Sequence, residues 1–151
     1  MGDPLAGKGP GELLRFASGE TVRILVDSRT SDGAFAILDC THVAGPTEPH
    51  VHRDAHKSVF VLSGRYRFVV DDAVFEAGPG DNVFIARGMP HEFVVGVDGG
   101  RALFVFSPGG IENYFRTLAI TAEDDSSADA IDALKRHYHI APTDSAPAVE
   151  P

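Results

Sequence analysis

Residues 45–64 read G-P-T-E-P-H-V-H-R-D-A-H-K-S-V-F-V-L-S-G and place two histidines, His50 and His52, two positions apart. Side chains at positions i and i+2 of an extended strand point to the same face, so the two imidazoles are expected to project side by side. Neutral imidazole nitrogens are good ligands for Zn, Fe, Ni and Cu. On its own the pair is a weak signal, because chance H-x-H pairs are common in a chain with seven histidines.

A third histidine strengthens the pattern. Residues 78–93 read G-P-G-D-N-V-F-I-A-R-G-M-P-H-E-F, in which His91 follows an expected strand and a Gly-Met-Pro turn. Antiparallel strands that are far apart in sequence can bring His91 opposite His50 and His52. These three residues are the candidate metal ligands.

The chain up to Ser107 consists of short runs rich in Val, Ile and Phe, separated by clusters of Gly and Pro. Short β-type segments at such spacing are typical of an all-β sandwich or barrel. The expected strands are Glu12–Phe16, Thr21–Asp27, Ala34–Val43, Ser58–Ser63, Tyr66–Asp71, Ala73–Glu76, Asn82–Ala86, Glu92–Val97 and Arg101–Ser107.

Two apolar stripes at helical spacing follow residue 107 and predict two short helices that pack against the β domain. The stripes are Ile111, Tyr114, Phe115 and Leu118, and then Ile131, Leu134 and Tyr138. Ser126, with Asp129 three residues later, predicts a capping box at the start of the second helix. The expected organisation is a flexible segment over residues 1–10, a single domain over 11–141, and a disordered tail over 142–151.

Composition excludes several classes of protein. Thirteen basic and twenty-two acidic side chains give a net charge of −9, which argues against a nucleic-acid partner. The single cysteine, Cys40, excludes an internal disulfide framework and is expected to be a small buried hydrophobe. No apolar run approaches the ~18–20 residues needed to span a membrane. The N-terminus has no apolar signal-peptide core, so we expect a cytoplasmic protein without a membrane partner.

Both histidine segments resemble the two motifs of the cupin superfamily. The first motif runs G-x5-H-x-H-x3–4-E-x6-G and is matched by Gly45 (one residue short in the first gap), His50, His52 and Gly64. The second runs G-x5-P-x-G-x2-H-x3-N and is matched by Gly80, Gly88 and His91.

The resemblance implies a cupin β-barrel of the double-stranded β-helix or jelly-roll type, here with one or two short C-terminal helices. It also implies a divalent transition metal (Fe, Ni, Mn, Cu or Zn) held inside the mouth by His50, His52 and His91, and a homodimer. The flanking sequence is similar to small bacterial cupins labelled quercetin-dioxygenase-like.

The chain departs from the family at three positions. The motif-two Pro is Ala86, the terminal Asn is Val95, and the motif-one Glu falls at Lys57. The first two changes cost little, but Lys57 replaces a carboxylate ligand with an ammonium group that cannot coordinate while protonated. Three outcomes are open: a three-histidine metal site, a metal-free pocket, or a substitute ligand from His56 brought in by a local bulge.

Lys57 itself has two interpretations. A lysine desolvated in an apolar pocket can act as a base or a Schiff-base nucleophile, which makes Lys57 a candidate catalytic residue. The favoured alternative is a lysine that reaches the mouth or pairs with Asp54. His42 could line the pocket, although a surface or edge position is favoured.

The functional hypothesis is a small-molecule enzyme, a metal-dependent dioxygenase-like oxidoreductase acting on an aromatic or oxygenated molecule. The alternative is a metal-free or metal-poor cupin that serves as a cyclase or isomerase, or as a non-catalytic ligand-binding protein. Fold alone does not decide between them.

Overall fold

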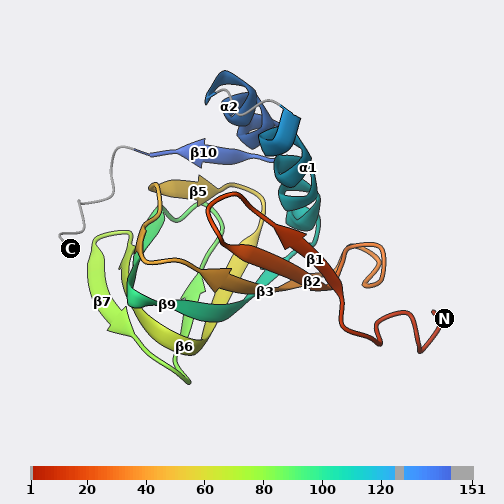
Figure 1. Cartoon of the computed structure of the whole chain (residues 1–151), viewed down its shortest axis with the longest axis horizontal. Coiled ribbons are helices and arrows are strands. Elements are labelled where there is room, and N and C mark those ends of the chain that lie inside the picture. The colour runs from red at the N-terminus through yellow and green to blue at the C-terminus, as the bar shows by residue number, and fades with distance from the viewer. Residues whose placement is uncertain (1, 125–127, 144–151) are drawn as a thin grey trace.

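The computed structural model describes residues 2–124 and 128–143, and most of the chain up to residue 107 is β-structure followed by two helices (Figure 1). The strands are β1 Glu12–Arg15, β2 Thr21–Val26, β3 Ala36–His42, β4 Gly45–Pro46, β5 His50–His52, β6 His56–Val70, β7 Ala73–Ala77, β8 Asn82–Ile85, β9 His91–Ser107 and β10 Ile140–Pro142. The helices are α1 Ile111–Asp124 and α2 Ala128–His137. The predicted all-β class with two C-terminal helices is confirmed.

Two long antiparallel strands, β6 and β9, form the centre of the sheet and pair along most of their length. The sequence predicted two separate strands in each of these segments, and the structure shows one continuous strand in each. The pairing register shifts on either side of Gly64, at Val61/Ser63 and at Gly64/Tyr66. Bulges of this kind bend a strand without ending it. Gly64 has a φ of +86°, and a Cβ there would collide with the carbonyl oxygen of Gly99.

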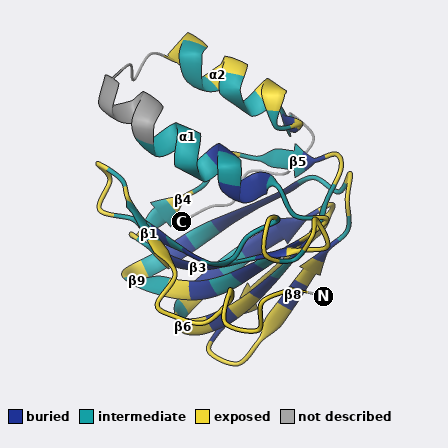
Figure 2. Ribbon diagram, turned by 90° about the vertical axis from the view of Figure 1, so that its right-hand side faces the viewer, coloured by how far each residue is buried: buried dark blue, intermediate teal, exposed yellow. Residues whose placement is uncertain are grey.

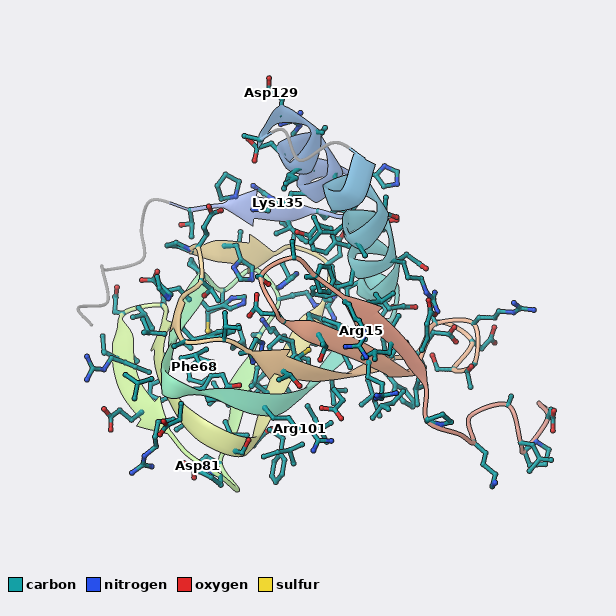
Figure 3. All side chains as sticks on the ribbon, in the orientation of Figure 1. Arg15, Phe68, Asp81, Arg101, Asp129 and Lys135 are labelled. Carbon is teal, nitrogen blue, oxygen red and sulfur yellow. The ribbon has the colours of Figure 1, made fainter. Side chains whose placement is uncertain are left out.

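The sheet path runs β1-β2-β3-β9-β5-β10, with β6 adding β7 and β8. The sheet curls so that alternate residues face its interior, where Phe68 is fully buried, whereas Arg101 lies on the outside (Figure 3). Tyr66, Phe68 and Val70 of β6 are buried on this inner face.

The helices lie together over one end of the curled sheet, beside β5 and β10 (Figures 1 and 2). Apolar residues of both predicted stripes pack against the core: Ile111, Tyr114, Phe115 and Leu118 of α1, Leu134 of α2, and Tyr138 directly after α2. Ile131, also predicted in the second stripe, is not part of this packing. The predicted capping box involves Ser126, which lies outside the described residues. Among the helices described, none is long and apolar enough to cross a membrane.

Three short strands were not predicted: β4, β5 and β10. β10 pairs antiparallel with β5, so that Ile140 faces His52 and Pro142 faces His50. Pro142, the first residue of the predicted disordered tail, is therefore part of the sheet. Residues 144–151 lie outside the described residues, and flexibility of residues 1–10 stays a prediction.

Candidate metal centre

Three imidazoles meet where β5 adjoins the beginning of β9. His50 is the register partner of His91, and His52 lies on the same strand as His50. One ring nitrogen from each histidine lies within 4.8 Å of the others. The ring centroids of His50 and His91 are 4.3 Å apart, and those of His52 and His91 are 5.5 Å apart. The structure thus brings together the three residues that the sequence singled out.

Backbone carbonyls hold two of these rings in one tautomer. His50 Nδ1–H donates to the carbonyl oxygen of Glu48 at 2.8 Å, and His91 Nδ1–H donates to that of Met89 at 3.1 Å. A carbonyl accepts but cannot donate, so the proton sits on Nδ1 and Nε2 keeps its lone pair. This is how outer hydrogen bonds orient metal-binding histidines.

The imidazoles are also neutral at pH 7. Burial, reinforced by the positive charge of Lys57, lowers the pKa of His50 to about 4. The same two causes lower the pKa of His52 and of His91 still further. Neutral, oriented imidazoles fit a divalent transition metal, because coordination requires the unprotonated nitrogen.

Lys57 lies beside this cluster and not at the surface. Its side chain is buried, with 3% exposure, and its Nζ donates to His91 Nε2 at 3.4 Å. The ammonium group lies 4.5 Å from the centroid of the Phe104 ring, and burial lowers the pKa of Lys57 to about 8. The favoured alternatives for Lys57, a lysine that reaches the mouth or one that pairs with Asp54, are both wrong. Asp54 lies instead 3.5 Å from His139.

His56 does not join the cluster. Its Nδ1 accepts from the backbone N–H of Arg87 at 3.0 Å, and its ring contacts Phe84 on the outer side of the sheet. The register shifts of β6 lie further along the strand, so no bulge turns His56 inward. The groups of potential ligands found among the described residues contain only the three predicted histidines.

The cluster opens on a cavity of about 670 Å³, large enough for a ligand of several rings. His50, His52 and Lys57 are part of its wall. The aromatic part of the wall consists of Phe16, Phe93, Phe104, Phe106, Tyr114 and Phe115. The helices also contribute to the wall, and one of their residues there is Lys135 of α2 (Figure 3).

Sequence reasoning named one further residue of this site without favouring it and missed another. His42 lines the cavity and is half-buried, whereas a surface or edge position was favoured. Its alternation with Leu38 and Cys40 on β3 was the available signal. Glu48 orients His50 through its carbonyl and reaches Lys135 of α2 through its carboxylate at 3.1 Å, a contact between distant segments that no local pattern predicts.

Residues 41–107 match the family model described as the cupin domain, and this part of the chain is a cupin domain. The match includes all three histidines and Lys57. The predicted cupin domain is therefore confirmed over these residues.

The chain is 29% identical over 85 residues to a quercetin 2,3-dioxygenase of Bacillus subtilis (strain 168). That stretch is 55% of this chain and 25% of the relative, so the chain spans about a quarter of the length of the curated relative it matches.

Solved structures resemble the fold over about two thirds of the chain. The polyketide cyclase RemF from Streptomyces resistomycificus is 28% identical with a TM-score of 0.54, covering 65% of this chain and 73% of RemF. KdgF from Halomonas sp. has a TM-score of 0.60 at 16% identity, covering 68% of this chain and 90% of KdgF. The similarity to KdgF shows the fold alone. The proteins that resemble this chain thus include enzymes of more than one reaction class.

Proposed function

We propose that this protein is a metal-dependent cupin enzyme that acts on an aromatic or oxygenated small molecule. The observation that carries the proposal is the group of three neutral imidazoles, His50, His52 and His91, beside an aromatic-walled cavity. A divalent transition metal held by these residues supplies Lewis acidity or activates oxygen when it is bound.

The other residues of the cavity bind and orient the substrate. The rings of Phe93, Phe104 and Phe106 offer faces and edges on which a planar molecule can stack. Lys57 Nζ lies 3.4 Å from His91 Nε2 and can hold or release a proton there. An anionic or enolic oxygen of the substrate is the natural partner of this group.

Dioxygenase-like oxidation is the first candidate reaction, supported by the 29% identity to a quercetin 2,3-dioxygenase. A cyclase or isomerase reaction is the second, and two observations favour it. Lys57 stands where the family has a carboxylate ligand, and a polyketide cyclase is 28% identical. In that case Lys57 acts as an acid or base, and substrate oxygens take the hydrogen bond that it now gives to His91.

Elemental analysis of protein purified without a histidine tag and without added metal tests the proposal. We expect about one equivalent of a transition metal in the parent protein and none in His50→Ala or His91→Ala. His137→Ala, which removes an exposed histidine of α2, is the matched control and should retain the metal. Circular dichroism establishes that the variants are folded.

The outcome also separates the two reaction classes. Iron, copper, nickel or manganese leads to oxygen-consumption assays with quercetin and catechol, and turnover there establishes the dioxygenase class. Zinc directs the search to cyclase and isomerase chemistry. Protein that is metal-free and takes up no metal on titration refutes the metal-dependent proposal and leaves a pocket built on Lys57.

A further inference from the structure

A second polar group faces the cavity apart from the three imidazoles. His42 is the last residue of β3 and pairs with Gly100 of β9. Its ring lies between two aromatic residues of the cavity wall, with centroid distances of 5.3 Å to Phe93 and 5.4 Å to Phe104. No ring contact or hydrogen bond joins it to the metal-site histidines among the described residues. Its role is therefore separate from that of the candidate ligands.

A buried tyrosine forms a hydrogen bond with Nδ1 of this histidine. His42 Nδ1 and Tyr66 Oη are 2.6 Å apart, and Tyr66 is 1% exposed. Tyr66 Oη has no other hydrogen-bond partner among the residues that the structure describes. If His42 donated in this contact, the phenol proton would be buried with no acceptor, which is costly. The Tyr66 hydroxyl therefore donates to Nδ1.

The backbone fixes this arrangement. Gly100 lies against the Tyr66 ring, and a Cβ at that position would approach Tyr66 Oη to 2.7 Å. Any larger residue would displace the phenol from His42. The absent side chain at Gly100 is thus part of what positions the pair.

As a consequence, His42 has a hydrogen-bond donor on Nε2. With Nδ1 accepting from Tyr66, the proton of the neutral ring sits on Nε2. Burial lowers the pKa of His42 to about 4, so the ring stays neutral at pH 7. Within the described part of the chain, Nε2 finds no hydrogen-bond partner, and the residue lines the cavity. This N–H group is therefore free to donate a hydrogen bond to a ligand in the cavity.

We propose that His42 donates a hydrogen bond through Nε2–H to a phenolic or carbonyl oxygen of an aromatic substrate, and that Tyr66 positions it for this task. The inference deepens the proposed function, since it concerns the substrate of the same cavity. It does not depend on a bound metal, because neither His42 nor Tyr66 contacts the three candidate ligands.

A pair of probes that differ by one oxygen tests the donor role. We would measure binding of 1-naphthol and of naphthalene to the chelator-treated and the untreated protein by probe fluorescence. The parent protein should prefer 1-naphthol by about tenfold, the order expected for one well-placed hydrogen bond. His42→Phe should abolish that preference and leave naphthalene binding within about twofold.

His42→Gln places an amide N–H near the position of Nε2 and should restore part of the preference. His137→Phe is the matched control outside the cavity and should bind both probes as the parent does. A parent protein with no preference for 1-naphthol, or a His42→Phe variant that keeps it, would overturn the proposal. Metal content is measured separately, so that failure of the His42 proposal can be distinguished from failure of the proposed metal-dependent function.

The positioning role of Tyr66 is tested separately, through the tautomer of His42. Nitrogen-15 NMR of the imidazoles should show His42 with an unprotonated Nδ1 and a protonated Nε2 in the parent protein. Tyr66→Phe removes only the hydroxyl and should mix the two tautomers and lower the preference for 1-naphthol several-fold. An unchanged tautomer in Tyr66→Phe contradicts the positioning role even if that variant is less stable.

Discussion

Replacement of Lys57 by methionine measures how strongly one buried cation opposes metal binding. Methionine is similar in length, carries no charge and packs well against aromatic rings such as Phe104. The variant removes the hydrogen bond that Lys57 donates to His91 Nε2, the nitrogen that a metal would use. It should therefore bind a divalent metal more tightly than the parent protein.

The parent protein can bind the metal with Lys57 charged or after Lys57 has lost its proton. The route that costs less free energy determines how much weaker its affinity is than that of the variant. A charged Lys57 about 4 Å from a divalent ion costs ~8 kcal/mol at an effective dielectric constant of about 20. Loss of the proton beforehand costs far less. Because burial lowers the pKa of Lys57 to about 8, deprotonation at pH 7 weakens binding only about tenfold. Lys57→Met should accordingly gain about tenfold in affinity at pH 7.

The metal affinity of the parent protein should also change with pH, in a direction set by the pKa of Lys57. Lys57 of the parent protein loses its proton as the pH rises through about 8, so its metal affinity should rise there and approach that of the variant by pH 9. The affinity of Lys57→Met should stay flat over this range, since the pKa of His50 lies at about 4 and those of His52 and His91 are also lowered.

Zinc titration in competition with a chromophoric chelator measures both affinities at pH 7 and pH 9. Lys8→Met, which removes an exposed lysine outside the cavity wall, is the matched control and should change the affinity less than twofold. Equal affinities of Lys57→Met and the parent at pH 7, or a gain that persists undiminished at pH 9, would refute the deprotonation argument.

Three further predictions concern stability and reactivity. Lys57→Met should stabilise the metal-free protein by about 3 kcal/mol at pH 7 in urea unfolding, and the gain should shrink from pH 8 to about 10.5 as folded and then unfolded parent protein deprotonates. Glu112, fully buried, accepts the backbone N–H groups of Ser28 and Gly110 at 2.6 and 2.8 Å, so Glu112→Ala should lower the unfolding free energy by about 3 kcal/mol, and a loss below 1 kcal/mol contradicts this role. Cys40 is buried with its pKa raised to about 12 by burial, so iodoacetamide should label it only after unfolding, as mass spectrometry would show.

The metal-site cluster was predictable because its cause is local and periodic. His50 and His52 are two apart, and a strand directs such residues to one face. The Gly-Met-Pro turn before His91 marks the start of the strand that brings the third ring across. The same period of two places Lys57 inward with Val59, but it does not say where the end of the side chain lies, and the favoured expectation for that end was wrong.

The continuity of β6 and β9 was not predictable from the same pattern. Gly64 and the pair Gly99–Gly100 looked like strand ends, since glycine usually marks a turn. In the structure these glycines face each other across the two strands, and the absence of side chains lets the backbones approach closely. Only the pairing of segments more than thirty residues apart distinguishes a bulge from a turn.

His42 illustrates a second limit. Its spacing from Cys40 placed it on the inward face, but its burial comes from Tyr66 and Phe93, which lie far along the chain. A polar residue at the end of a strand is more often exposed, so the local pattern favoured the wrong position. The hydrogen bond to Tyr66 offsets the cost of burial, and that bond exists only in the folded chain.

The cupin-domain match includes all three candidate ligands but only part of the cavity wall. The cupin-domain match ends at residue 107, yet part of the wall comes from α1, including Tyr114 and Phe115. β10, also beyond the match, pairs with the strand that carries His50 and His52. The three candidate ligands therefore lie within the matched residues, whereas the cavity wall combines matched residues such as Phe93 and Phe104 with residues beyond the match. The histidine motif is common to the family and argues for a shared cofactor, whereas the part of the wall that the helices add is specific to this chain's own sequence beyond residue 107.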